Sequence, residues 1–134
     1  MGTRSITKFI EDNNTIVTIY QQYDGYPYPS GVGFQIQEAL GSRRLTNGFQ
    51  DPDNDVNGVG CAAALYIAYA KRDMQAGNVY IIPEEEGDDL MISYTYTIKG
   101  YHDAPHLGLQ LMIQDPGNSI IYDGPLSEFD SEKL

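Results

Sequence analysis

Two Gly-x-Gly sequences are the residues whose type and spacing best suit ligand chemistry. They are Gly31-Val32-Gly33 and Gly58-Val59-Gly60, and each opens a segment predicted to be helical. Glycines at a helix start leave N–H groups accessible at its positive end, where phosphate oxygens bind. We predict an anion site at the first pattern, including Ser30, Gly31 and Gly33. Plain turn geometry is the alternative, because neither pattern is a P-loop or dinucleotide fingerprint.

The loop before the first glycine pattern is rich in aromatic residues and proline, and reads Tyr23-Asp24-Gly25-Tyr26-Pro27-Tyr28-Pro29. Tyrosine faces stack on a base or ring, and the prolines order the loop at low entropic cost. We therefore predict a ligand ring on Tyr23, Tyr26 or Tyr28, with Asp24 beside them. The open alternative is a rigid loop that plugs the core of its own domain.

The few basic residues are the natural partners of a bound phosphate. Nineteen acidic residues face eight basic ones, which gives a net charge of -11. Guanidinium groups suit phosphate oxygens, so Arg4, Arg43 and Arg44 complete the predicted site. The overall charge repels nucleic acids and anionic membranes and attracts basic protein surfaces. Solubility alone is another explanation of this charge.

Three further patterns are better explained without metal or catalytic chemistry. The sequence Asp53-Asn54-Asp55-Val56-Asn57-Gly58 opens like a calcium loop, but Ala64 stands where the bidentate glutamate belongs. His102 and His106 flank a predicted turn without a third ligand nearby. Cys61 lies among alanines in a predicted buried helix, unlike an exposed catalytic thiol. We predict no metal, no cofactor and no enzymatic activity, and leave calcium open.

The elements that must position these residues follow from periodicity. Alternating patterns predict strands at residues 3–10, 15–20, 78–82, 90–99, 107–114 and 119–122. Helical spacing predicts helices at 32–40 and 59–74, the first with Ser30 as N-cap and Gly41 as its end and the second ended by Gly77. We expect a long loop at 42–57, an exposed acidic turn at 83–89 and a frayed tail after Pro125.

The order β-β-α-α-β-β-β-β predicts one α+β domain spanning residues 1–134. It consists of an antiparallel sheet of about five to six strands with both helices on one face. The second helix is apolar almost all round, so we expect a partner subunit to cover its outer face, as in a homo-oligomer. One cysteine and the lack of a signal or membrane-spanning segment predict a cytoplasmic protein.

Several motifs together carry a family resemblance. The opening Met1-Gly2-Thr3-Arg4-Ser5, the Tyr23–Pro27 and Ser30–Gly33 segments, and Asn57-Gly58-Val59-Gly60-Cys61 resemble a family of short phage and bacterial proteins. The likeness extends to the Tyr122-Asp123-Gly124-Pro125 turn. More distantly, the first quarter of the chain is similar to the Thoeris anti-defence sponges of phages. That resemblance implies binding, without cleavage, of cyclic ADP-ribose-type signals.

Two functional hypotheses follow. The first is a non-enzymatic phage-type counter-defence protein, in the host cytoplasm, that sequesters a small phosphate-containing, nucleotide-derived signal. The second is an acidic inhibitor that occupies a basic, nucleic-acid-binding surface of a host protein. The acidic segments at 51–55 and 84–89 support the second hypothesis if they gather on one face, and count against it if they are dispersed.

Overall fold

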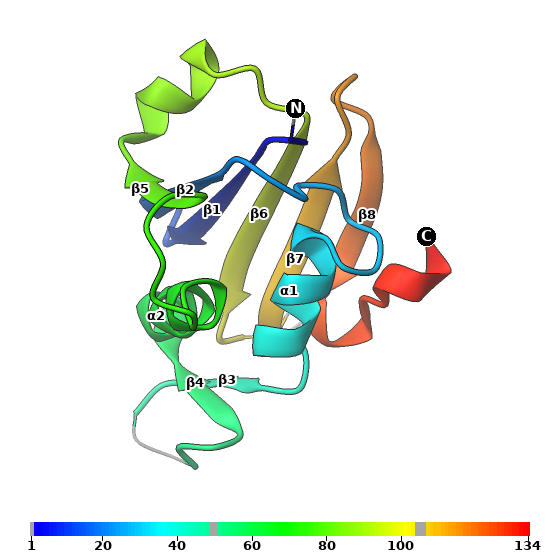
Figure 1. Cartoon of the computed structure of the whole chain (residues 1–134). Coiled ribbons are helices and arrows are strands. Elements are labelled where there is room, and N and C mark those ends of the chain that lie inside the picture. Colours follow the sequence, from blue (N-terminus) through cyan, green and yellow to red (C-terminus); the bar gives the residue numbers. More distant parts are fainter. Residues whose placement is uncertain (1, 49–50, 104–106) are drawn as a thin grey trace.

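The predicted α+β architecture is confirmed by the computed structural model, which describes residues 2–48, 51–103 and 107–134. Figure 1 shows a twisted sheet with both helices on one face. The strands of the six-stranded sheet are β1 (Ser5–Glu11), β2 (Asn14–Gln21), β5 (Val79–Ile82), β6 (Tyr94–Tyr101), β7 (Gly108–Gln114) and β8 (Ile120–Pro125). The helices are α1 (Val32–Leu40) and α2 (Gly58–Ala70). The bounds of α1 are those predicted, and α2 begins within one residue of its predicted start.

The sheet order is β5-β2-β1-β6-β7-β8, and its central pair differs from the expectation of a wholly antiparallel sheet. β1 and β6 run parallel, with Phe9 opposite Ile98, whereas the other neighbouring strands are antiparallel. From the β1–β2 hairpin the chain passes through both helices into β5, which lies at the sheet edge beside β2. It then crosses through residues 84–89 to enter β6 beside β1, in the same direction as β1. Such a crossover gives a parallel pair. β6 begins at Tyr94, later than predicted.

Alternating residues of the central strands face the helices and form the core. Phe9, Tyr96, Ile98, Leu111 and Ile113 are fully buried on this face. The helices cover them with residues at helical spacing, namely Val32, Ile36 and Leu40 from α1 and Val59, Ala62, Ala63 and Tyr66 from α2. Burial of this apolar surface is the main force that fixes both helices against the sheet.

The outer face of α2 is less apolar than the sequence suggests. The helix ends at Ala70 rather than Met74, and its exposed positions are Gly60, Ala64 and Ala68. These residues offer little apolar area, while the larger Leu65 and Ile67 pack against the core. The structure of one chain therefore does not require a subunit over α2. No helix among the described residues is long and apolar enough to cross a membrane.

The segment predicted as a long loop contains a second small sheet. Its strands are β3 (Arg44–Thr46) and β4 (Asp55–Asn57), which pair in parallel below the two helices (Figure 1). Each has three residues, too few for a periodic signal in the sequence. This pair connects the end of α1 to the start of α2.

The C-terminal segment is ordered rather than frayed. It forms two short 3₁₀ turns, η2 (Leu126–Glu128) and η3 (Ser131–Lys133). Leu126 and Phe129 are buried, and the Phe129 ring meets that of Tyr122 edge-on, with centroids 5.0 Å apart. Two apolar side chains thus anchor the segment that was predicted to be a frayed tail. A third 3₁₀ turn, η1 (Glu84–Asp89), follows β5 and holds the predicted acidic turn.

Candidate functional site

The predicted ligand-binding residues divide into two groups at opposite ends of α1. The residues from Tyr23 to Gly33 surround its N-terminal end, where the main chain of Arg4 also lies close to Gly25. Arg43 and Arg44 follow its C-terminal end at Gly41. The nine-residue helix separates the groups by roughly 12 Å, at a rise of about 1.5 Å per residue. One small ligand does not reach both groups.

The glycine amides at the start of α1, which were predicted to bind an anion, already have hydrogen-bond partners within the chain. The N–H of Gly31 donates to the carbonyl of Tyr28 at 2.9 Å, and that of Gly33 donates to Tyr26 at 3.4 Å. Between them, the N–H of Val32 donates to the carbonyl of Asp24 at 2.8 Å. The glycines serve close packing instead, because a Cβ at Gly33 would lie 2.4 Å from the carbonyl oxygen of Pro27. These contacts favour turn geometry, the alternative explanation of the Gly-x-Gly pattern.

Ser30 does not cap α1 as predicted. The N-cap is Gly31, no side chain bonds there, and Ser30 adopts a positive φ of 76°. Asp24 also has a positive φ, of 58°. Two non-glycine residues in the left-handed region make this a tightly constrained loop.

The tyrosine loop combines an anchored main chain with exposed rings. The hydroxyl of buried Tyr96 donates to the carbonyl of Gly25 at 2.6 Å, so the loop backbone is tied to the core. The rings of Tyr23 and Tyr28 remain 53% and 45% exposed. Tyr26 stacks on Tyr28 with centroids 6.4 Å apart, and desolvation, aided by the Asp24 carboxylate, raises the pKa of Tyr26. The backbone of the loop thus packs on the core, while the rings of Tyr23 and Tyr28 form an exposed aromatic surface.

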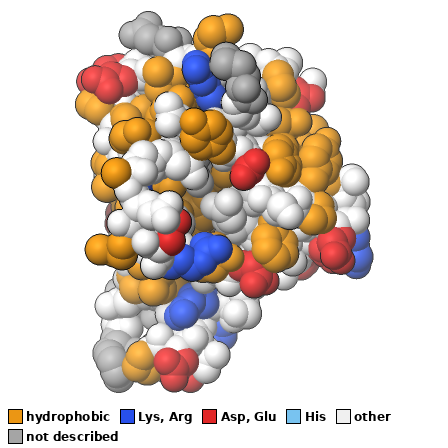
Figure 2. Space-filling model, viewed as in Figure 1, with side chains coloured by type: hydrophobic (Ala, Val, Ile, Leu, Met, Phe, Trp, Pro, Cys, Tyr) orange, Lys and Arg blue, Asp and Glu red, His pale blue; other side chains and the backbone are white. Residues whose placement is uncertain are grey.

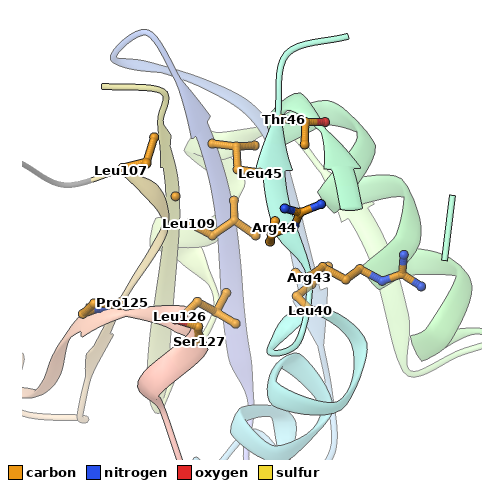
Figure 3. Close-up of a pocket in the computed structure, with 11 residues that line it drawn as sticks. Leu40, Arg43, Arg44, Leu45, Thr46, Leu107, Leu109, Pro125, Leu126 and Ser127 are labelled. Atoms are coloured by element: carbon orange, nitrogen blue, oxygen red, sulfur yellow. The ribbon is translucent and has the colours of Figure 1, made fainter. Parts of the chain in front are cut away.

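A pocket of about 420 Å³ lies at the other end of α1, between β3, β7 and the start of the C-terminal segment. Figure 3 shows four leucines converging on it from separate elements, namely Leu40, Leu45, Leu109 and Leu126. Leu107 and Pro125 form its outer rim, while Thr46 and Ser127 add hydroxyls. The volume lies in the range of small-molecule sites, and the walls are mainly apolar.

Arg44 is held in place at this pocket by Asp55. Its Nε donates to Oδ1 of Asp55 at 3.0 Å and its Nη2 donates to Oδ2 at 3.3 Å. The Arg44 side chain is 75% exposed, whereas that of Asp55 is 4% exposed. Among the contacts of the described residues, Nη1 of Arg44 has no partner within the chain. An oriented guanidinium with one free nitrogen is suited to a second anion.

Arg43 contributes differently from the prediction. Its Nη1 donates to the main-chain carbonyls of Pro52 and Asp55, each at 3.3 Å. Figure 3 shows its guanidinium pointing away from the leucines, so only the base of the side chain lines the pocket. Arg43 therefore fixes the loop that carries Asp55, whereas the Arg44 guanidinium lies across β3 from Leu45 and Leu109 at the edge of the pocket (Figure 3).

The leucines of this pocket were not predicted from the sequence. Leu45 lies in the segment interpreted as a loop, and Leu126 lies in the segment expected to fray. Leu109 was assigned to the buried side of a strand, which is correct but did not reveal the gap beside it. A pocket made by residues far apart along the chain has no local sequence signal. Arg43 and Arg44 are the predicted site residues that line this pocket.

A second groove, of about 590 Å³, continues from the first around the end of the sheet. It shares Leu107 and Pro125 with the first pocket and opens on the sheet face away from the helices. Lys99, Tyr101 and Asp123 line it. A ligand that extends beyond the first pocket would therefore meet an aromatic ring and charges of both signs.

The calcium-like loop is used for internal contacts. Asp55 binds Arg44 and also accepts from the Asp51 N–H at 3.0 Å, and Asp51 accepts from the side chain of Asn54 at 2.7 Å. Within the described ranges, no three His, Cys, Asp or Glu residues form a metal-binding group. His106 lies outside the described residues, and His102 is exposed. Cys61 is half-buried on α2.

The acidic residues do not form a single patch. The 51–55 segment lies at the β3–β4 end of the molecule and the Glu84–Glu86 turn lies at the opposite end, beyond β5 (Figure 1). Figure 2 shows acidic side chains dispersed over the visible face among apolar ones. Dispersion is the arrangement that counts against a nucleic-acid mimic.

No protein-family model matches the chain, and neither curated proteins nor solved structures give a match.

Proposed function

We propose that this protein binds a small organic anion in the leucine-walled pocket beside Arg44 and holds it without transforming it. The observation that carries the proposal is the joining of an apolar cavity to an oriented guanidinium in a chain of net charge -11. The net negative charge of the chain repels an anionic ligand at long range. Binding therefore requires that the contacts with Arg44 and the pocket walls outweigh this repulsion.

The pocket lining defines the ligand class. Leucines and Pro125 give it apolar walls, so the ligand needs an apolar body of matching size. Nη1 of Arg44 offers two N–H donors to a phosphate or carboxylate group, and Thr46 and Ser127 offer hydroxyls. Nucleotide-derived signals, which the resemblance to anti-defence sponges implies, are the first candidates. Their phosphate would meet Arg44, and a ring extending outward would reach Tyr101.

Sequestration, rather than catalysis, is favoured by the chemistry of the lining. Among the described residues that line the pocket there is no His, Cys, Asp or Glu to serve as nucleophile or base. Retention of a signal without cleavage would make the protein a counter-defence factor in a host cell. The inhibitor hypothesis receives no support from the dispersed acidic residues.

A thermal-denaturation screen tests this proposal. The probes are cyclic AMP, ADP-ribose, cyclic ADP-ribose and, as a non-nucleotide anion, decanoate. A ligand that binds the folded chain alone raises the melting temperature by mass action, and the rise grows with ligand concentration. The shift should be reduced by Arg44→Gln and retained by Arg72→Gln, whose guanidinium lies over the ring of Tyr69 on α2. Equal shifts in both variants would contradict the proposal.

A further inference from the structure

The outer edge of β5 is an unpaired edge of the six-stranded sheet that carries exposed apolar side chains. β5 pairs with β2 on one side and ends the sheet on the other (Figure 1). Its sequence, Val79-Tyr80-Ile81-Ile82, carries no charge. Ile81 is 66% exposed and Tyr80 is 42% exposed. An uncharged edge strand with exposed large side chains is a template for pairing with another strand.

The opposite edge of the sheet is β8, and it is less suited than β5 to pairing with a strand of another chain. β8 carries Asp123, Gly124 and Pro125, and proline has no N–H to donate to a ladder. The hydroxyl of Tyr122 already donates to the carbonyl of Pro125 at 2.6 Å. The contrast between the two edges directs strand pairing to β5.

Charges of opposite sign lie at the two ends of β5. Lys71 and Arg72 precede the strand, and the Lys71 ammonium donates to the carbonyls of Gln75 and Gly77, each at 2.6 Å, next to the strand start. Glu84, Glu85 and Glu86 follow the strand directly after Pro83. Two of the eight basic residues are therefore at one end and three acids are at the other.

We propose that β5 pairs antiparallel with β5 of a second copy of this chain, joining two sheets across a twofold axis. An axis perpendicular to the sheet directs the end of each strand that carries Glu85 and Glu86 toward the Lys71 and Arg72 end of the other, while Glu84 is held by Thr15 and Lys8 of its own chain. Side chains directly opposite each other must then share a face, which pairs Ile81 with Ile81 or Tyr80 with Tyr80 of the two copies. This charge arrangement is what selects a second copy over an unrelated strand.

The predicted association is weak and depends on concentration. Four residues per copy give a short ladder, so the interface belongs to the small, transient class. Attraction between the exposed terminal charges is reduced by salt. The proposal concerns a different surface from the ligand pocket, so its outcome does not depend on whether a ligand binds there.

Sedimentation-velocity experiments on the full chain over a wide concentration range test the pairing. We expect a monomer–dimer equilibrium that weakens at high salt. Ile81→Lys should weaken it by about tenfold or more, because it puts a charge beside apolar Val79 in the Tyr80 register and two like charges at the axis in the Ile81 register. Ile120→Lys is the matched control, since Ile120 is similarly exposed on the β8 edge, and it should leave the equilibrium unchanged.

A charge exchange tests the choice of a second copy. Arg72→Glu and Glu85→Arg should each weaken dimer formation, and the double variant should recover it. A wild-type chain that stays monomeric at every concentration overturns the proposal. So does a dimer that withstands Ile81→Lys, or a double variant that associates no better than the single variants.

Discussion

Arg44 and Asp55 are directly opposite each other in the parallel β3–β4 pair, and their side chains form a two-bond ion pair. The carboxylate is buried and the guanidinium is exposed, so the interaction holds an outward-facing cation in a fixed place. This relationship joins the small sheet to the pocket that it helps to line. Asp55, one of the residues that resembled a calcium loop, therefore positions the Arg44 guanidinium.

Asp55→Asn should destabilise the fold by about 1–2 kcal/mol, because the amide loses the negative charge and replaces one of the two oxygens that accept N–H groups of Arg44 and Asp51 with a donor. Urea unfolding monitored by circular dichroism measures the change. Asp53→Asn is the control, because Asp53 is exposed on the same loop, and its effect should stay within about 0.5 kcal/mol. Equal losses in the two variants would mean that the ion pair does not organise the loop.

Gly33→Ala and Gly60→Ala should change stability in opposite directions. A Cβ at Gly33 would collide with the backbone of Pro27, at a cost of about 1–3 kcal/mol. A Cβ at Gly60 has Ile16 as its nearest neighbour at 4.0 Å, and alanine favours the helix by about 0.5–1 kcal/mol. Both are measured by thermal unfolding. A neutral Gly33→Ala would show that the tyrosine loop does not pack tightly on α1.

Phe129→Ala should cost about 3 kcal/mol or more, since the ring is buried against Tyr122 and the core. The same denaturation experiment compares it with Leu134→Ala, whose side chain is largely exposed and whose loss should be nearly neutral. The loss at Phe129 should also disturb the pocket, because the preceding Leu126 forms one of its walls. A small effect at Phe129 would restore the expectation of a frayed tail.

Glu84 should titrate below the ordinary range of a glutamate. The Thr15 hydroxyl donates to Glu84 Oε2 at 2.7 Å and, with Lys8 at 3.5 Å, lowers the pKa of that carboxyl. A carboxyl with a lowered folded-state pKa stabilises the fold above its unfolded pKa, and that contribution disappears as pH falls through the folded-state value. Acidification should therefore weaken the attachment of η1 to β2.

NMR titration of the side-chain carboxyl carbons measures this effect. Thr15→Val should move the pKa of Glu84 upward, toward its ordinary value. Asp51 serves as the internal control, because its pKa is lowered chiefly by the side chain of Asn54. A Glu84 pKa that does not respond to Thr15→Val would remove the hydroxyl as the cause.

The helices and strands that were predicted from the sequence are those long enough to show a hydrophobic period. Alternation around Tyr96 and Ile98 located β6, and apolar spacing located α1 between Val32 and Leu40. The parallel pairing of β1 with β6 had no local signal, because it depends on the path of the chain between them. β3 is too short to show a period, and tertiary contacts of Phe129 override the polar character of the tail.

The candidate site was predicted only in part. The scarcity of cations drew attention to Arg43 and Arg44, which line the pocket, whereas the glycine amides before α1, which were predicted to bind an anion, are bonded within the loop. The partners of the main-chain amides in a loop depend on how the loop folds. The Gly-x-Gly pattern alone therefore does not show whether its amides are free to bind a ligand. The leucines of the pocket come together only through packing of β3, β7 and the C-terminal segment.

The most direct test of the account is a methyl-detected NMR titration of the wild-type chain with cyclic AMP, ADP-ribose, cyclic ADP-ribose and decanoate. We predict that at least one probe shifts the methyl signals of Leu45, Leu109 and Leu126, and that Arg44→Gln weakens its binding by about tenfold or more. Tyr28→Ala, at the far end of α1, should leave that binding unchanged. Absence of leucine shifts with all four probes, or binding that is lost in Tyr28→Ala and kept in Arg44→Gln, would contradict the account.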